Sequence, residues 1–351
     1  MNTELAELIR QTIRAHGSQS FAWFMQQALY HPEHGYYSSG RCVIGRKGDY
    51  FTNVSVGPLF GQLLAAQFTE IWERLGRPDH FAIVEQGAHD GQFARDVLES
   101  SQKRSPEFFE ALRYRIVEPF PILQERQART LDSFREKIEW CDSLQPFVGV
   151  HFSNELLDAM PVRLIGGDVE KLVDLKGDKF VFVDRPGHDD ANFNQAALDW
   201  IDSVAVNLQR GYVITIDYWR SGGEFHEKIQ VRAQHRNLDS PFEEIGHADI
   251  TMGLCWPSIV ERAQANRLHV AGFTDQHHFL TGIISESPDL TPESGAKIKR
   301  ELQTLLHPEM LGRAFQVLAL SKNVDFAAPK LVGFKFAGEP DTALALIDPS
   351  R

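Results

Sequence analysis

Short apolar segments that alternate with helical patterns between residues 81 and 218 constrain the fold more than any other feature of this sequence. The segments are continuous apolar runs, which is typical of strands that are covered on both faces of a sheet. Strands that alternate with helices form βαβ units, so the sequence predicts an α/β fold with a parallel sheet. The expected strands are "FAIVE" (81–85), "YRIVE" (114–118), "IEWCD" (138–142), "VGVHFSNE" (148–155) and "GYVITIDY" (211–218).

The segments on either side of these strands suggest a division into four regions. Residues 1–80 carry apolar side chains at helical spacing and are expected to form an N-terminal helical cap, with Ser20 as one helix N-cap. The core is expected over 81–218, interrupted by hairpins at about 161–190. A helical insertion with a long polar loop is expected over 219–310, and closing strands over 311–351, drawn from "RAFQVLALSK" and "KLVGFKF".

Polar residues follow the first four expected strands at the point where each strand ends. In open parallel sheets, ligands bind outside the carboxyl ends of the strands, near the point where the strand order reverses. One ligand can therefore contact all four strand ends. The residues are Glu85 and Gly87 after the first strand, Glu118 after the second, Asp142 and Ser143 after the third, and Asn154 and Glu155 after the fourth.

The chemistry of these residues suits an adenosine with an amino-acid tail. Gly87 and Gly91 allow the backbone to approach a ligand closely, and the start of the following helix offers free N–H groups to a carboxylate. Glu118 can accept hydrogen bonds from both hydroxyls of a ribose, and Asp142 with the Ser143 N–H can pair with an adenine edge. The set predicts S-adenosylmethionine as the cofactor.

A dinucleotide fits this turn less well. The GxGxxG pattern that cradles a pyrophosphate is absent, and His89 and Asp90 would place an acid beside the phosphates. A nicotinamide-dependent dehydrogenase is therefore a distant alternative.

Composition limits the partners and the compartment. The formal net charge is −12, which argues against non-specific binding to nucleic acid or to an anionic membrane. No apolar run approaches the roughly 18 residues that a membrane helix needs. The three cysteines are far apart and form no CxxC pair, so neither a disulfide framework nor a metal site is expected, and a cytoplasmic protein is predicted. A homodimer is left open.

Several strings resemble one known family in order along the chain. They are "FMQQALYHPEHGYYS", "IGRKGDYFT", "LFGQLLA", "IVEQGAHDG", "SNELLDAMPVR", "RAQHRNLDSPFEEIGHADIT" and "HPEMLGRAFQVLALSK". These strings resemble the MidA-like S-adenosylmethionine-dependent methyltransferases, whose mitochondrial member is an arginine methyltransferase needed to assemble respiratory complex I. The resemblance implies a class I, Rossmann-like methyltransferase sheet with an N-terminal helical cap and a C-terminal α+β insertion.

The sequence departs from the family pattern at several positions near the expected site. The family has G-P-G-x-G at the cofactor turn, a Pro-Glu pair after "GDYFT", and a His and an Asp after "DIT". These positions hold Ala88 and His89, Val54 and Ser55, and Gly253 and Cys255. Thr52, in the "GDYFT" string, is expected to close over the cofactor.

The resemblance also implies a protein substrate, with arginine as the methyl acceptor. A guanidinium has a pKa above about 12 and is a poor nucleophile while it is protonated, so carboxylates must orient it and accept a proton. We assign Glu155 and Asp158 to acceptor binding and proton acceptance, and Asn154 to orientation. Two alternatives remain: a cofactor-binding assembly protein that no longer catalyses transfer, and a small-molecule methyltransferase. The acceptor and the number of methyl groups stay open.

Overall fold

The computed structural model describes residues 3–42, 52–187, 194–218, 229–290, 295–325 and 329–346. The chain divides into two compact units. The sheet unit comprises Thr52–Leu156, Trp200–Trp219 and Cys255–Arg351, and the N-terminal unit comprises Met1–Phe51, Leu157–Asp199 and Arg220–Leu254. Among the described residues, no helix combines the length and the apolarity that crossing a membrane requires.

A seven-stranded sheet in the order β13-β14-β9-β5-β2-β3-β4 forms the centre of the sheet unit. The strands from β4 to β9 pair in parallel, whereas β14 is antiparallel to both of its neighbours. The predicted α/β class is therefore confirmed. The strands are β2 (Phe81–Gln86), β3 (Leu112–Val117), β4 (Ile138–Cys141), β5 (Phe147–Asn154), β9 (Leu208–Tyr218), β13 (His269–Asp275) and β14 (Phe315–Lys322).

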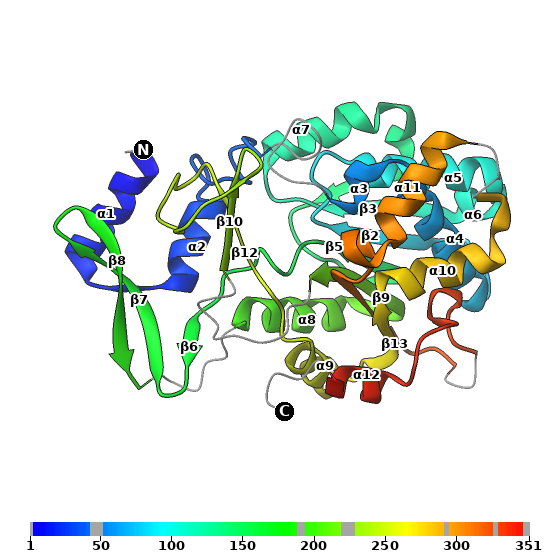
Figure 1. Cartoon of the computed structure of the whole chain (residues 1–351). Helices are drawn as coiled ribbons and strands as arrows, with labels where there is room; N and C mark the ends of the chain where they lie inside the picture. Colours follow the sequence, from blue (N-terminus) through cyan, green and yellow to red (C-terminus); the bar gives the residue numbers. More distant parts are fainter. Residues whose placement is uncertain are drawn as a thin grey trace. The chain divides into compact units, whose positions relative to one another are not determined.

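Helices connect these strands and cover the sheet (Figure 1). Helix α8 (Gln195–Asn207) begins within the residues assigned to the N-terminal unit and ends within the sheet unit. The other helices of the sheet unit are α3 (Asn53–Val56), α4 (Leu59–Arg74), α5 (Gln92–Arg104), α6 (Pro106–Ala111), α7 (Pro121–Thr130), α9 (Trp256–Ala265), α10 (Gln276–Glu286), α11 (Ala296–Leu306) and α12 (Pro340–Leu346), with short helical turns η1 (Asp132–Lys137), η3 (Pro288–Leu290), η4 (Pro308–Gly312) and η5 (Val332–Phe334).

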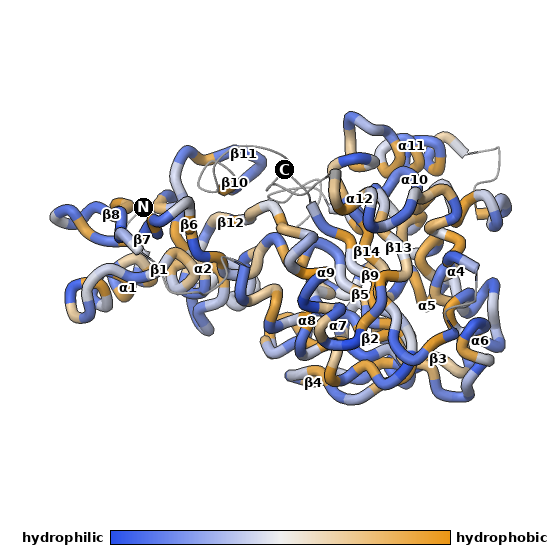
Figure 2. The backbone as a smooth tube through the Cα atoms, turned by 90° about the horizontal axis from the view of Figure 1, so that it is seen from below, coloured by the Kyte–Doolittle hydropathy of each residue, from blue (hydrophilic) through white to orange (hydrophobic). Residues whose placement is uncertain are grey.

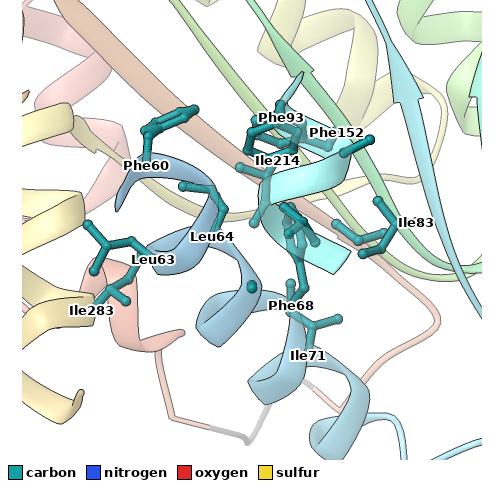
Figure 3. Packing of buried hydrophobic residues seen from close by; sticks show 14 of the residues in the cluster. Phe60, Leu63, Leu64, Phe68, Ile71, Ile83, Phe93, Phe152, Ile214 and Ile283 are labelled. Carbon is teal, nitrogen blue, oxygen red and sulfur yellow. The ribbon is translucent and has the colours of Figure 1, made fainter. Parts of the chain in front are cut away.

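One face of the sheet packs against α4, α5 and α10 to form the main core. Because successive strand residues point to opposite faces, alternate residues of each strand enter this core. The rings of Phe93 and Phe152 stack with their centroids 4.4 Å apart, and Phe68 from α4 packs edge-on against both (Figure 3). Apolar stretches recur along the strands of this sheet (Figure 2), which matches the continuous apolar runs of the sequence.

The opposite face of β2 and β5 contains a buried polar group. His151 is fully buried, and its Nε2 atom lies 2.8 Å from Gln86 Oε1, which also accepts a hydrogen bond from the Trp200 indole of α8 at 3.0 Å. Burial lowers the pKa of His151 to about 3, so the imidazole is neutral. This contact fixes α8 against the sheet.

In the described part of the N-terminal unit, α1, α2 and two small sheets surround a core of their own. Thr3 and Ser20 cap the helices by accepting hydrogen bonds from Ala6 and Trp23 N–H groups, so the predicted cap at Ser20 is confirmed. The predicted antiparallel hairpins are also present. The elements are α1 (Glu4–His16), β1 (Gln19–Ser20), α2 (Phe21–Tyr30), β6 (Leu164–Gly166), β7 (Val169–Lys176), β8 (Lys179–Pro186), β10 (Ile229–Ala233), β11 (Arg236–Asn237) and β12 (Asp249–Met252).

The two units divide the chain differently from the four expected regions. Helix α4 was expected in a cap over 1–80, but it supplies Phe60, Leu64 and Phe68 to the core of the sheet unit. The described residues of 219–310 do not form one helical insertion. Residues 229–254 form the β10-β12 sheet and contribute to the core of the N-terminal unit, whereas α9, β13, α10 and α11 belong to the sheet unit. Residues 219–228 of the expected polar loop lie outside the described residues.

The prediction of closing strands over 311–351 is confirmed for "RAFQVLALSK", which contains β14, and is wrong for "KLVGFKF". That segment forms η5 rather than a strand, because side chains of α4 bind its backbone donors. Val332 N–H donates to Glu70 and Gly333 N–H donates to Gln67 Oε1 at 2.9 Å. The edge strand is instead β13, which follows α9. A chain segment whose N–H groups are bound by side chains cannot use them in a strand ladder.

Candidate active site

The strand order reverses between β2 and β5, which end side by side in the sheet. From β2, the chain runs outward through β3 and β4 on one side, and it then returns to β5 and β9 on the other side. This reversal is the position at which open α/β sheets bind ligands. A Cβ atom built on Gly87, after β2, would lie 3.4 Å from Leu156 Cδ1, so the turns that follow β2 and β5 are in contact.

The turn after β2 contains three residues in the left-handed backbone region. Their φ angles are +82° at Gly87, +47° at His89 and +80° at Gly91. Gly91 precedes α5, and Asp90 accepts the Gln92 N–H of the first turn at 3.1 Å. His89 holds a backbone conformation that favours glycine. The turn therefore keeps the glycine geometry at a non-glycine residue.

Glu85, which was predicted to contact the cofactor, has a buried side chain. Its carboxyl lies on the core face of β2, is 4% exposed, and accepts a hydrogen bond from the Tyr114 hydroxyl at 2.6 Å. Burial raises the pKa of Glu85 to about 8, although the Tyr114 bond lowers it, so the carboxyl is mostly protonated at neutral pH. Alternate residues of a strand point to the same face, so Glu85 lies on the core face of β2 together with Phe81 and Ile83.

Glu118 lies directly after β3 and is 5% exposed. The Phe120 N–H donates to its Oε1 at 3.0 Å, and Gln127 Nε2 donates to its Oε2 at 3.1 Å. Burial raises the pKa of Glu118 to about 6, against the lowering effect of these two bonds and of His89. A carboxylate accepts about four hydrogen bonds, so both oxygens keep capacity for the hydroxyls of a ribose.

Asp142 and Ser143 follow β4 and are both exposed. Gln124 joins this strand end to the preceding one, because its Nε2 donates to the Glu118 carbonyl at 2.7 Å and lies 3.4 Å from Asp142 Oδ1. The ends of β3 and β4 are thus neighbours, as expected for residues that contact one adenosine.

A cluster of polar side chains forms at the end of β5. Glu155 Oε1 accepts the Asn53 N–H at 3.2 Å and Asn154 Nδ2 at 2.9 Å, and Asn53 Nδ2 donates to Asn154 Oδ1 at 2.9 Å. Asn53 is fully buried. Glu155 has a φ of +51°, and its N–H donates to Ile216 O on β9. The cluster fixes the Glu155 carboxylate from two directions.

Thr52 and Ser55 set the position of Asn53. Thr52 accepts the Ser55 N–H at 3.2 Å, and Ser55 Oγ accepts the Thr52 N–H at 2.9 Å, which is a reciprocal cap at the start of α3. Ser55, which replaces a family glutamate, therefore has a structural partner. Residues 43–51, which include most of the "IGRKGDYFT" string, lie outside the described residues.

Two residues of the site were not predicted from the sequence. Asn53 was missed, although a Thr-x-x-Ser spacing around it is a signal for a helix start. Asp217, at the end of β9, is fully buried and accepts the Leu156 N–H at 3.1 Å. It anchors the turn that carries Glu155. Asp217 could have been identified from the sequence, because it is an acidic residue near the end of an apolar strand.

Asp158 belongs to the N-terminal unit. It is 4% exposed, and its carbonyl accepts the Met252 N–H at 2.8 Å. The charge of Asp158 acts on Tyr30, whose pKa is raised mainly by burial and then by the charges of Asp249 and Asp158. The structure groups Asn154 and Glu155 with Asn53 in the sheet unit, and Asp158 belongs to the N-terminal unit.

These residues fit S-adenosylmethionine chemically. A buried acid with spare acceptor capacity follows β3, polar groups follow β4, and a glycine turn leads into the 13-residue helix α5. Gly91 favours glycine because its φ is +80°, and a Cβ atom there would lie in tight contact with Leu131 Cδ1 at 3.1 Å. Within the described residues, no group of three His, Cys, Asp or Glu side chains could hold a metal ion.

Comparisons with known proteins agree with this architecture. A family model described as "Putative S-adenosyl-L-methionine-dependent methyltransferase" matches residues 63–274. A Drosophila melanogaster relative, named protein arginine methyltransferase NDUFAF7 homolog, mitochondrial, is 26% identical over 388 residues, which cover 91% of this chain and 85% of the relative. A Bos taurus protein arginine methyltransferase NDUFAF7, mitochondrial, is 25% identical and covers 88% of this chain and 81% of its own length.

A solved structure of similar fold contains the product form of the cofactor. It is a COG1565 superfamily member from Burkholderia thailandensis bound to S-adenosyl-homocysteine, with a TM-score of 0.86 and 27% identity over 96% of both chains. The strand order, the strand-end residues and these similarities agree on one cofactor, S-adenosylmethionine, and on a class I methyltransferase fold. The chain belongs to the MidA-like family of S-adenosylmethionine-dependent methyltransferases.

Proposed function

We propose that this chain transfers a methyl group from S-adenosylmethionine to an arginine side chain of a protein. The main observation in support is the Asn53–Asn154–Glu155 cluster. It holds the Glu155 carboxylate at the end of β5, beside the turn after β2. The names of the insect and bovine relatives, protein arginine methyltransferases, support the choice of acceptor.

The cofactor would be held by residues from three strand ends. Glu118 would accept the ribose hydroxyls, Asp142 and the Ser143 N–H would pair with the adenine edge, and Gly87 and Gly91 would let the backbone approach the methionine tail. Thr52 and Asn154 would border the cofactor on the β5 side, and Glu85 would support the turn through Tyr114. The bound cofactor supplies an electrophilic methyl group on a sulfonium, which reacts by in-line displacement.

Glu155 would bind and orient the acceptor. A guanidinium is always protonated in water, and its nitrogens become nucleophilic only when a carboxylate localises the charge and accepts a proton during transfer. Two donors on Oε1 fix the Glu155 carboxylate, so little side-chain freedom is lost when a cation binds. Asn154 would position Glu155, because its amide bridges Glu155 and Asn53. The role proposed for Asp158 in acceptor binding rests on the family resemblance.

A labelling experiment tests this function. The protein is incubated with methyl-labelled S-adenosylmethionine and a lysate from cells that lack it, and labelled proteins are hydrolysed to amino acids. We expect label in methylarginine, and we expect Glu155→Gln to abolish it while Glu139→Gln, a surface variant, retains it. Label in another amino acid would overturn the choice of acceptor.

Two other functions would give different results in the same experiment. A small-molecule methyltransferase would label only the low-molecular-mass fraction. A cofactor-binding assembly protein would bind S-adenosylhomocysteine but transfer no label. The three free thiols, Cys42, Cys141 and Cys255, support a reducing compartment, such as the predicted cytoplasm. A homodimer stays a prediction.

A further inference from the structure

The amide of Gln127 on α7 connects two parts of the cofactor site. Gln127 is fully buried, and its Nε2 donates to Glu118 Oε2 at 3.1 Å and to the His89 carbonyl at 3.0 Å. Its Oε1 accepts the Trp140 indole N–H at 2.9 Å. One side chain thus joins the acid after β3, the turn after β2 and the strand β4.

Trp140 fixes the orientation of this amide. An indole N–H can only donate, so the oxygen of Gln127 must face Trp140. The NH₂ group then faces two acceptors, the Glu118 carboxylate and the His89 carbonyl. The reversed amide would place its oxygen against both acceptors and leave the indole without a partner, which is costly in a buried site. The network therefore has one arrangement.

The contact with His89 matters because this residue lacks the freedom of glycine. His89 has a φ of +47°, in a region where an L-residue is strained, and its carbonyl is held by Gln127. The helix also packs on the end of the turn, since a Cβ atom on Gly91 would lie 3.4 Å from Gln127 Cα. The turn geometry thus depends on α7.

We infer that Gln127 is a positioning residue for the cofactor: it holds the Glu118 carboxylate and the His89 turn at a fixed separation, and Trp140 sets its direction. This inference rests on the proposed placement of Glu118 against the ribose. Gln127 itself need not contact the cofactor. Its effect is to orient Glu118 before the ligand binds, which reduces the ordering cost of binding.

The charged groups around Glu118 determine a second readout. The charge of His89, which lies beside Asp90, acts on Glu118 from the turn after β2, and Gln124 links the Glu118 backbone carbonyl to Asp142 at the end of β4. The Gln127 bond and the nearby His89 both lower the pKa of Glu118, whereas burial raises it. Loss of Gln127 should therefore raise this pKa and move the pH dependence of cofactor binding to higher pH.

The test is calorimetry of S-adenosylhomocysteine binding over a pH series. Gln127→Leu should weaken binding by about 10-fold, as expected for a hydrogen bond to a charged group, and should move the binding midpoint to higher pH. The matched control is Gln67→Leu. Gln67 is equally buried and bonds a carboxylate, Glu70, and a backbone N–H, but it lies on α4 away from the strand ends. Gln67→Leu should leave both the affinity for S-adenosylhomocysteine and the pH midpoint of binding unchanged.

Trp140→Phe provides a second variant if Gln127→Leu does not fold. It removes only the donor that orients the amide, and we expect about 3-fold weaker binding. If Gln127→Leu folds, Trp140→Phe should have no further effect in that background. Additive effects of the two substitutions would overturn the inference.

Glu118→Ala separates this inference from the proposed site. If Glu118→Ala weakens binding and Gln127→Leu matches Gln67→Leu in affinity and pH profile, the role of Gln127 is wrong and the site stands. If Glu118→Ala binds like the unmodified protein, the placement of the ribose and the role of Gln127 both fail.

Discussion

The Asn53 N–H donates a hydrogen bond to Glu155 Oε1 at 3.2 Å, across 102 positions of the sequence. The Asn53 side chain also donates to Asn154 Oδ1, so the start of α3 and the end of β5 hold one carboxylate together. An acceptor site built this way depends on a residue of the short helix α3, which lies outside the sheet.

Asn53→Ala should therefore reduce methyl transfer more than cofactor binding. The substitution removes the bond to Asn154 and loosens Glu155, so we expect kcat to fall by about 10-fold or more while affinity for S-adenosylhomocysteine changes by less than about 3-fold. Steady-state kinetics on a labelled protein substrate and calorimetry measure the two quantities. A loss confined to cofactor affinity would contradict the assignment of Asn53 to the acceptor side.

Cofactor binding should weaken as pH falls through about 6. The pKa of Glu118 is raised to about 6 by burial, and its ionised form accepts hydroxyl hydrogen bonds more strongly than the neutral acid does. Calorimetry with S-adenosylhomocysteine measures the change in affinity at pH values about one unit apart, from about pH 5 to about pH 8. Glu118→Gln should bind weakly and remove the pH dependence; a profile that this variant leaves intact would assign the titration to another group.

Stability should fall as pH rises from about 4.5 to about 8 because of Glu85. Burial raises the pKa of Glu85 to about 8, so the folded chain keeps a proton that the unfolded chain releases. The slope from this single group is at most about 1.4 kcal/mol per pH unit. Thermal unfolding across this range should show a shallower decline for Glu85→Gln than for the unmodified protein, whereas Glu139→Gln should match the unmodified protein.

His151 should contribute the opposite slope at acid pH. Its pKa is lowered to about 3 by burial, so the unfolded chain binds a proton between about pH 6.5 and pH 3 that the folded chain does not. Stability is therefore lost as pH falls through this window. In His151→Leu, the Gln86 oxygen keeps its bond from Trp200, and unfolding should become less sensitive to acid. Equal acid sensitivity in the two proteins would show that His151 is not the group responsible.

The parallel sheet was predictable because short apolar segments, of which β2 and β9 are the clearest, alternate with helical patterns along the chain. The edge strand β13 was not predictable, because its sequence, HVAGFTD, includes His269, Gly272 and Asp275 and contains no long apolar run. "KLVGFKF" alternates like a strand, yet η5 forms there because Glu70 and Gln67 bind its N–H groups. Both errors arise from partners that are distant in sequence, which local patterns do not reveal.

The candidate site was predictable at the strand ends, since a parallel sheet brings its carboxyl ends to one edge. The direction of each side chain was not. Glu85 points into the core because it lies two positions after Ile83 on β2, and its partner Tyr114 lies on the next strand. Asn53 and Gln127 reach the site through helices whose packing only the folded chain defines.

A crystal structure of this protein with S-adenosylhomocysteine tests the central claim most directly. We expect the ribose hydroxyls within hydrogen-bond distance of Glu118, the adenine beside Asp142, and the sulfur directed toward Asn154 and Glu155. Adenosine bound elsewhere, or a sulfur directed away from Glu155, would contradict the account.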